Sequence, residues 1–331
     1  MDRIVVIGGS AGAIEALKRL ASQLPEDFPA PVCVVVHMSA DAPGLLDTIL
    51  GHAGRLPAQY AKDGMPLRAG RFYIAPPDHH LLVEKDSLLV TRGPKENRFR
   101  PAVDPLFRSA AQAYGSATIG VVLSGGLDDG TAGLQVIKDL GGTAVVQDPN
   151  DAAVPSMPVT AARHVEVDYI VPIGEMGSLL ARLAAMSVPT RAAAVQSTVE
   201  VEVKIAKQHK PLDAGVLQLG APSPIACPEC HGVLLQVAAQ GILRFRCHTG
   251  HAYSIETLVA AVDEGIETAL WNAVRALEEG QMLLRQLADH TMRHDPNAAD
   301  DLITQSVNAG NDAETVRHLA IERQALDTRR A

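Results

Sequence analysis

The stretch at residues 5–17, "VVIGGSAGAIEAL", joins an apolar run to an amphipathic run through a glycine-rich turn. The continuous β-branched residues before the glycines predict a buried strand, and the amphipathic residues after them predict a helix. The turn itself fits the pattern G-x-S-x-G, which can hold a serine hydroxyl above the end of a sheet. Ser10 is therefore a candidate nucleophile, with the alternative that it only caps the following helix.

The same alternation of apolar and amphipathic runs continues to about residue 185. Strand–helix alternation predicts an α/β fold built on a doubly wound, mostly parallel sheet. At 80–93, two short apolar runs around "EKDS" instead predict an antiparallel hairpin attached to that sheet. The predicted sheet strands are IVVIG (4–8), VCVVVHM (32–38), RFYIAPP (71–77), TIGVVLSG (118–125), TAVVQD (143–148) and YIVPIG (169–174).

Composition narrows the class of protein. The chain has 331 residues, 47% of them hydrophobic, and a net charge of −9. The acidic balance argues against nucleic acid as a partner and against a zinc-dependent DNA-binding regulator, because phosphate binding needs clustered Lys and Arg. No apolar run approaches the roughly 20 residues of a membrane helix, so we expect a protein that is not membrane-inserted. The first strand begins without a signal peptide, and the four cysteines favour a reducing compartment, so we expect a cytoplasmic protein.

Two further groups with proton-transfer chemistry follow predicted strands. His37 ends the second strand, and Asp128 and Asp129 lie in the glycine-rich turn after 118–125. The carboxyl ends of parallel strands meet at one edge of a sheet, so Ser10, His37 and one of the two aspartates can converge as nucleophile, base and orienting carboxylate. A dinucleotide site would need an acidic residue where His37 stands, and a P-loop would need a Lys-Ser/Thr pair. The order Ser, His, Asp also differs from that of α/β-hydrolases.

Six blocks extend this pattern in one order through residues 3–185: IGGSAGAIEAL, VVHMS, YIAPPDHHLLV, FRPAVDPLFRSAA, VVLSGGLDDGTAGL and QDPNDAAVPSMPVTA. Together they resemble the catalytic domain of CheB-type protein-glutamate methylesterases of bacterial chemotaxis. The resemblance implies Ser10 as nucleophile, His37 as general base and then acid, and Asp129 as the orienting carboxylate. It also implies hydrolysis of glutamate γ-methyl esters on chemoreceptors, with methanol released and no cofactor needed for catalysis.

Other positions follow from the resemblance or depart from it. The backbone N–H groups of Ala11 and Gly126 are expected in the oxyanion hole, and His80 matches a histidine near the active face. Gly126 and Leu127 stand where the family's turn has methionine and glycine. These departures leave open the alternative of a catalytically inactive signalling scaffold. Since Met1 lies nine residues before Ser10, we expect no receiver domain ahead of the catalytic domain.

A cysteine segment follows at 225–254. Cys227 and Cys230 form a C-x-x-C pair, and Cys247 and His251 come about 16 residues later, which is zinc-ribbon spacing. These four residues predict a structural zinc site, with His248 as the alternative fourth ligand. The alternatives are a redox C-x-x-C pair or a segment that binds nothing. The fourth cysteine, Cys33, lies inside an apolar strand and is expected to be plain core.

The chain is therefore divided into a catalytic domain (1–187), a linker (188–224), a zinc-ribbon-like segment (225–254) and terminal helices (255–331). The linker is predicted because no periodicity is sustained there. Helices are expected at 254–294, with Ser254 as N-cap, and at 312–326. They can pack on each other and on the ribbon, or present a docking surface for a protein partner.

Overall fold

The computed structural model describes residues 3–188, 197–239 and 242–327, and the side chains of 238–239 and 324–327 are not described. The chain divides into two compact units, Met1–Leu258 and Val259–Ala331. This division differs from the predicted boundaries, because the cysteine segment falls in the same unit as the α/β domain.

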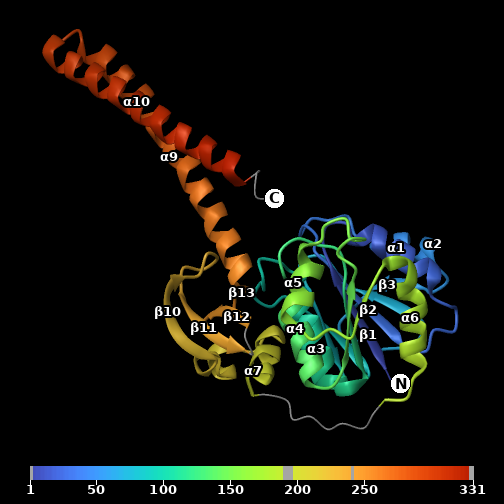
Figure 1. Ribbon diagram of the computed structural model, residues 1–331. Helices are drawn as coiled ribbons and strands as arrows, with labels where there is room; N and C mark the ends of the chain where they lie inside the picture. Colours follow the sequence, from blue (N-terminus) through green and yellow to red (C-terminus); the bar gives the residue numbers. More distant parts are fainter. Residues whose placement is uncertain (1–2, 189–196, 240–241, 328–331) are drawn as a thin grey trace. The chain divides into compact units, whose positions relative to one another are not determined.

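The first unit is built on a seven-stranded parallel sheet in the order β3-β4-β2-β1-β7-β8-β9 (Figure 1). Six of these strands are the apolar runs predicted from the sequence, so the doubly wound α/β fold is confirmed. The short β3 was not predicted. The strands are β1 (Ile4–Gly9), β2 (Pro31–Val36), β3 (Ala58–Tyr60), β4 (Arg71–Ile74), β7 (Thr118–Val122), β8 (Thr143–Gln147) and β9 (Tyr169–Val171).

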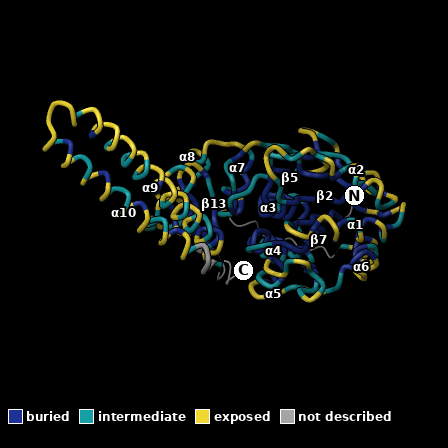
Figure 2. The backbone as a smooth tube through the Cα atoms, turned by 90° about the horizontal axis from the view of Figure 1, so that it is seen from above, coloured by how far each residue is buried: buried dark blue, intermediate teal, exposed yellow. Residues whose placement is uncertain are grey.

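Helices cover both faces of the sheet, as Figure 1 shows. Alternate residues of β1 point to opposite faces, so Val5 and Ile7 join one hydrophobic core while Ile4 and Val6 join the other. The first core is closed by α1 (Ala13–Gln23), α2 (Leu46–Ala53) and α6 (Ile173–Ala185). The second is closed by α3 (Val103–Tyr114), α4 (Thr131–Asp139) and α5 (Ser156–His164), with a 3-10 turn at Gly115–Ala117. In Figure 2 the sheet and α3 are the most deeply buried part of this unit.

The predicted hairpin is present, but it forms a sheet of its own. Strands β5 (His80–Glu84) and β6 (Ser87–Thr91) pair antiparallel and make a separate two-stranded sheet. Leu81 and Val83 of β5 are buried in the same core as α3. The hairpin is thus joined to the domain by side-chain packing on α3 and by backbone hydrogen bonds to residues 64–67, and it does not pair with the main sheet.

The predicted linker is wrong over residues 197–224. This stretch folds as α7 (Ser197–Ala206), α8 (Pro211–Ala214), a 3-10 turn (Val216–Gln218) and the start of β10. Val199 and Val203 are buried, and Glu202 of the same helix is only 1% exposed. A ten-residue helix with a buried glutamate breaks the apolar periodicity on which the prediction relied. Residues 189–196 of the predicted linker lie outside the described residues.

The cysteine segment belongs to a four-stranded antiparallel sheet in the order β10-β11-β12-β13. Its strands are β10 (Gly220–Ala226), β11 (Val233–Ala239), β12 (Ile242–Cys247) and β13 (Ala252–Ser254). Ser254 caps the following helix as predicted, since the backbone N–H of Thr257 donates to its Oγ at 3.0 Å.

The second unit is a helical hairpin of α9 (Ile255–Thr291), which begins in the first unit, and α10 (Pro296–Asp327). The helices are joined by the Ser306 hydroxyl donating to Gln281 O at 3.0 Å and by the Arg317–Glu278 and Arg323–Asp263 ion pairs. The second helix was expected to begin at 312. It begins at Pro296, where proline suits the first turn and Asp295 accepts from the N–H of Ala298.

Exposed apolar side chains continue along α9, among them Val262, Ile266, Leu283 and Leu287. Figure 2 shows most of the hairpin as exposed or half-buried. The docking of a protein partner here stays a prediction. Among the described helices, none combines the length and the apolar character that crossing a membrane requires.

Candidate active site and metal centre

Ser10 lies at the carboxyl edge of the sheet, directly after β1. Its N–H donates to Ser124 O at 2.9 Å, which ties the turn to the segment following β7. Gly125 permits this approach, because a Cβ at that position would lie 2.9 Å from Cβ of Ser10 and 2.1 Å from Sδ of Met157. The N-cap of α1 is Gly12, at φ +80°, and no side chain caps this helix. The alternative in which Ser10 only caps the helix is therefore wrong.

His37 and Asp129 are brought together from two different strand ends. His37 Nε2 lies 2.7 Å from Asp129 Oδ2, and the two side chains are 3% and 1% exposed. The Phe99 ring stacks on the imidazole, with centroids 3.8 Å apart and planes 10° apart. The second ring nitrogen, Nδ1, is buried and has no hydrogen-bond partner in the described part of the chain. Ser10 is thus not hydrogen-bonded to His37, as is common in sites without substrate.

The Asp129 carboxylate accepts four hydrogen bonds from the described residues. Oδ2 accepts from His37 Nε2 and from the N–H of Val103 at 2.7 Å, and Oδ1 accepts from Asn97 Nδ2 at 2.8 Å and from the N–H of Asp104 at 3.2 Å. Burial alone would raise the pKa of Asp129, but the hydrogen bond from His37 and these further donors hold that pKa below its usual value. The carboxylate is therefore kept ionised and fixed in orientation.

The neighbouring Asp128 has a different partner. Its Oδ1 accepts from the Ser254 hydroxyl at 2.7 Å, and burial raises the pKa of Asp128 to about 8. Of the two aspartates that the strand pattern left open, the structure pairs Asp129 with His37. Leu127, where the resembling family has glycine, takes a left-handed φ of +60°.

The structure places the three remaining predicted residues, His80, Ala11 and Gly126, in different settings. His80 is fully buried, its Nε2 lies 2.9 Å from Pro94 O, and its Nδ1 accepts from the N–H of Ala102. Its two ring nitrogens hydrogen-bond to residues 94 and 102 of the following loop, and neither reaches the His37–Asp129 pair. The N–H groups of Ala11 and Gly126 donate no hydrogen bond within the described residues, and a Cβ at Gly126 would meet open space. Both amides are thus available as donors.

Three residues of this site were missed by sequence reasoning: Asn97, Phe99 and Asp104. Asp104 accepts from Asn97 Nδ2 at 3.0 Å and from the N–H of Gly133 at 2.6 Å. Burial and the nearby Asp129 raise the pKa of Asp104 to about 6. Phe99 and Asp104 lie in the block FRPAVDPLFRSAA, which carried the family resemblance, and that block was the one available signal.

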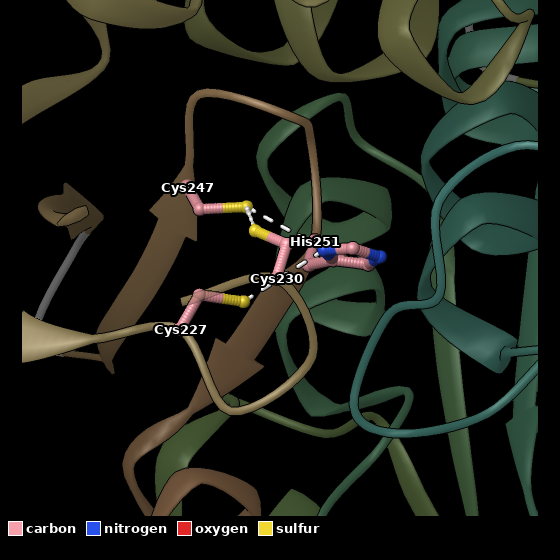
Figure 3. Close-up of side chains that lie close together, drawn as sticks. All are labelled: Cys227, Cys230, Cys247 and His251. Atoms are coloured by element: carbon pink, nitrogen blue, oxygen red, sulfur yellow. Dashed lines mark hydrogen bonds between the residues drawn. The ribbon is translucent and has the colours of Figure 1, made fainter. Parts of the chain in front are cut away.

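The four predicted metal ligands lie together, as Figure 3 shows. Cys227 and Cys230 come from the turn after β10, Cys247 ends β12, and His251 precedes β13. Their four ligand atoms all lie within 4.8 Å of one another, so this is a group that can bind a metal ion. The cysteines are free thiols, not disulfides. His248 and His231 are exposed and outside the cluster, and Cys33 is buried in the core as predicted.

Three distances within the cluster match those expected around a tetrahedrally coordinated ion. Sγ of Cys230 and Sγ of Cys247 are 3.6 Å apart, and His251 Nδ1 lies 3.6 Å from Sγ of Cys247 and 3.7 Å from Sγ of Cys227. Bonds of about 2.3 Å to sulfur and about 2.1 Å to nitrogen give ligand separations of about 3.6–3.8 Å in a tetrahedron. The hydroxyl of Thr249 lies within 3.2 Å of three ligand atoms and can donate to a thiolate.

A buried cluster of charges joins the cysteine segment to the α/β domain. Arg246 forms ion pairs with both Glu96 and Glu202 at 2.9 Å. Glu96 also pairs with Arg108, and Arg244 forms a bidentate pair with Glu202. All five side chains are at most 9% exposed. Burial alone would raise the pKa of Glu202, but the three arginines hold that pKa well below its usual value.

Replacing Glu202 by alanine should therefore destabilise the fold strongly. Removing one partner of a buried ion pair leaves an uncompensated charge and costs about 3–5 kcal/mol. Urea unfolding of the Glu202→Ala variant measures this loss. Glu200→Ala, which changes an exposed residue of the same helix, is the matched control and should alter the unfolding free energy by less than about 0.5 kcal/mol. Equal stability of the two variants would contradict the importance of the cluster.

Comparisons with known proteins agree with this geometry. Residues 5–180, more than half of the chain, match the family model described as CheB methylesterase. A Leptospira interrogans protein whose name gives protein-glutamate methylesterase and protein-glutamine glutaminase is 38% identical over 180 residues, 54% of this chain and 93% of its own length. Protein-glutamate methylesterase/protein-glutamine glutaminase 2 of Anaeromyxobacter dehalogenans is 41% identical over 54% of this chain, which spans about half (53%) of that protein.

A solved structure gives the same result for the fold. The crystal structure of the Thermotoga maritima CheB methylesterase catalytic domain is matched with a TM-score of 0.53 and 35% identity, over 55% of this chain and 99% of that one. The cysteine segment lies beyond the residues matched by the family model. On the evidence of its fold, its His37–Asp129 pair and these matches, the chain belongs to the CheB methylesterase family.

Proposed function

We propose that this chain is a serine hydrolase that removes γ-methyl esters from glutamate side chains of methyl-accepting chemoreceptors. Ser10 is the nucleophile, His37 the general base and then acid, and Asp129 the orienting carboxylate. One observation carries the proposal: His37 is hydrogen-bonded to Asp129 through Nε2, while its buried Nδ1 is left without a partner at the edge of the sheet where β1 delivers Ser10.

The proton path follows from that arrangement. With Nε2–H donating to Asp129, the lone pair of the imidazole lies on Nδ1, so Nδ1 is the atom that takes the proton of Ser10. The hydroxyl oxygen attacks the ester carbonyl, the imidazolium returns the proton to the leaving methanol, and water then cleaves the acyl-enzyme with His37 again acting as base. The ionised Asp129 stabilises the imidazolium in both steps.

The amides of Ala11 and Gly126 are our candidates for stabilising the tetrahedral intermediate. Donors aimed at a developing oxyanion contribute about 2.7–4 kcal/mol each. Ala11 follows Ser10 directly, and Gly126 follows Gly125, which packs against Ser10. Neither amide donates a hydrogen bond to another of the described residues. The same acyl-enzyme can form from a glutamine side chain with ammonia as leaving group, so the proposal extends to glutamine deamidation.

For the cysteine segment we propose a structural zinc ion held by Cys227, Cys230, Cys247 and His251. Three thiolates and one imidazole complete a closed tetrahedral site, and such an ion stabilises the fold around it. Free thiols of this kind are kept reduced in the cytoplasm, which is where we place the protein. None of the catalytic steps above needs a metal.

Zinc stoichiometry distinguishes the two candidate histidines. The native chain should bind one zinc ion per molecule, and His251→Ala should bind it far more weakly because one of four ligands is lost. His248→Ala is the matched control in the same turn and should keep one ion. Loss of zinc in the His248 variant alone would assign the fourth ligand to that residue instead.

The activity is tested with receptors carrying isotopically labelled methyl esters. The native chain should release labelled methanol and leave a carboxylate on the receptor, and the same receptor without esters serves as the control. Ammonia measured in the same reaction reports deamidation. A folded protein that releases no methanol from methylated receptors would overturn the esterase and favour the alternative of a non-catalytic signalling scaffold.

A further inference from the structure

Asn97 is the one side chain other than His37 that hydrogen-bonds the Asp129 carboxylate within the described residues. The other two donors, Val103 and Asp104, use backbone N–H groups at the start of α3. Asn97 is 4% exposed, and its amide nitrogen reaches both Asp129 Oδ1, at 2.8 Å, and Asp104 Oδ2, at 3.0 Å. It therefore sets the position of the oxygen that His37 does not touch.

Asn97 is in turn held by the end of the cysteine segment and by the first turn of α9. Its Oδ1 accepts from the N–H of Ser254 at 2.9 Å and from the Thr257 hydroxyl at 3.2 Å, and its own N–H donates to Ala252 O at 2.8 Å. Its φ of +50° is left-handed, a conformation that asparagine tolerates better than most residues. Each of these partners lies about 155–160 residues further along the chain, outside the part matched by the CheB family model.

The strand that holds Asn97 begins one residue after a metal ligand. Strand β13 pairs antiparallel with β12, and the turn that joins them carries Cys247 and His251. The N–H of Cys247 donates to His251 O at 3.0 Å, and that of Gly250 to Cys247 O at 2.9 Å. An ion bound by Cys247 and His251 would close this turn and so fix the strand that contacts Asn97.

The buried ion cluster ties the same strands to the same loop. Glu96 is adjacent to Asn97 in sequence and bonds Arg246 of β12, which also donates to Gly250 O at 2.7 Å inside the metal turn. Because the pairs are buried, their geometry is not loosened by solvent. The loop that presents Asn97 and the turn that carries the candidate ligands are therefore connected by buried contacts through Arg246.

We propose that Asn97 is a positioning residue for the Asp129–His37 pair and that the cysteine segment holds Asn97 in place. Metal binding at Cys227, Cys230, Cys247 and His251 then supports catalysis from outside the α/β domain. The inference rests on the proposed esterase function. It makes the cysteine segment a part of the active-site scaffold and not an independent appendage.

Two variants of Asn97 test the positioning. Asn97→Gly keeps the left-handed backbone and removes the amide, whereas Asn97→Asp keeps the shape and replaces the donor to Asp129 by a carboxylate. Both should lower kcat for methanol release by about ten- to a hundred-fold with little change in KM. Losses of this size are found when the hydrogen-bond partners of metal-ligating residues are removed. Arg275→Ala, which removes an exposed ion pair with Glu279 inside α9, is the control and should keep the native kcat.

A spectroscopic readout separates positioning from mere stability. In histidine-labelled protein, the proton on His37 Nε2 should give a downfield resonance in the native and Arg275→Ala chains. This resonance should broaden or vanish in both Asn97 variants. Native kcat and an unchanged resonance in folded Asn97→Gly would overturn the proposal. Because the resonance needs no substrate, it tests the inference even if methylated receptors prove not to be the substrate.

The coupling between metal binding and the His37–Asp129 pair is tested with the full native chain and its Cys247→Ser variant. Removing the ion with a chelator should broaden the His37 resonance and lower kcat by the same factor as Asn97→Gly, and added zinc should restore both. The double variant of Asn97→Gly and Cys247→Ser should lose no more than Asn97→Gly alone, because both changes break one connection. A stripped chain with native resonance and kcat, or additive losses in the double variant, would overturn the coupling.

Discussion

Replacing Ser10 by alanine should reduce kcat for methanol release by about a million-fold, the loss found when the nucleophile of a serine hydrolase is removed. The variant keeps His37, Asp129 and the candidate oxyanion donors, but it has no oxygen with which to form an acyl-enzyme. Its fold should be unchanged, since the Ser10 hydroxyl makes no hydrogen bond in the described structure.

The matched control is Ser22→Ala on α1, an exposed serine whose hydroxyl bonds only Arg19 O among the described residues. This variant should release methanol at the native rate. Steady release by the Ser10→Ala chain, at a rate close to that of Ser22→Ala, would show that the serine is not the nucleophile and that the esterase mechanism is wrong.

Replacing Asp129 by asparagine should lower kcat by about 10⁴-fold, as for the carboxylate of other catalytic triads. Both carboxylate oxygens already accept two donors each. An amide NH₂ at the Oδ2 position would face His37 Nε2 and push the imidazole proton onto Nδ1, which is the atom required as base. At the Oδ1 position the NH₂ would face the amide of Asn97 and the N–H of Asp104 instead.

Asp128→Asn is the control for this second prediction. Asp128 has a pKa of about 8 and is therefore mainly protonated at neutral pH, so an amide is a close substitute there. Its kcat should stay within a few-fold of native. A large loss in Asp128→Asn and a small one in Asp129→Asn would show that Asp128, and not Asp129, is the orienting carboxylate. Urea unfolding of both variants separates lost catalysis from lost stability.

The parts of the fold that sequence predicted are those with local signals. Strand β1 and its helix follow from a β-branched run, a glycine turn and an amphipathic run, all within 20 residues. The candidate metal ligands also follow from spacing, because C-x-x-C and Cys-x-x-x-His place their donors on two turns of one small sheet. His37 was a candidate because a strand ends immediately before it.

The parts that sequence did not predict depend on distant partners. In the sequence, Glu202 is a polar residue that interrupts a short apolar pattern. Its burial is explained by its ion pairs with Arg244 and Arg246, which lie more than 40 residues away along the chain. Asn97 carries no local signal, since its partners are Asp129 on one side and Ser254 on the other. Such contacts are made in the folded chain by groups that no window of sequence contains.

The most direct test of the central claim is to trap the acyl-enzyme. A receptor peptide carrying a glutamate γ-methyl ester is mixed with the native chain, quenched in acid within one turnover and digested for mass spectrometry. We predict a glutamyl adduct, equal to the peptide less methanol, on Ser10, and none in the Ser10→Ala chain. Methanol release without any adduct, or an adduct on one of the cysteines, would contradict the mechanism.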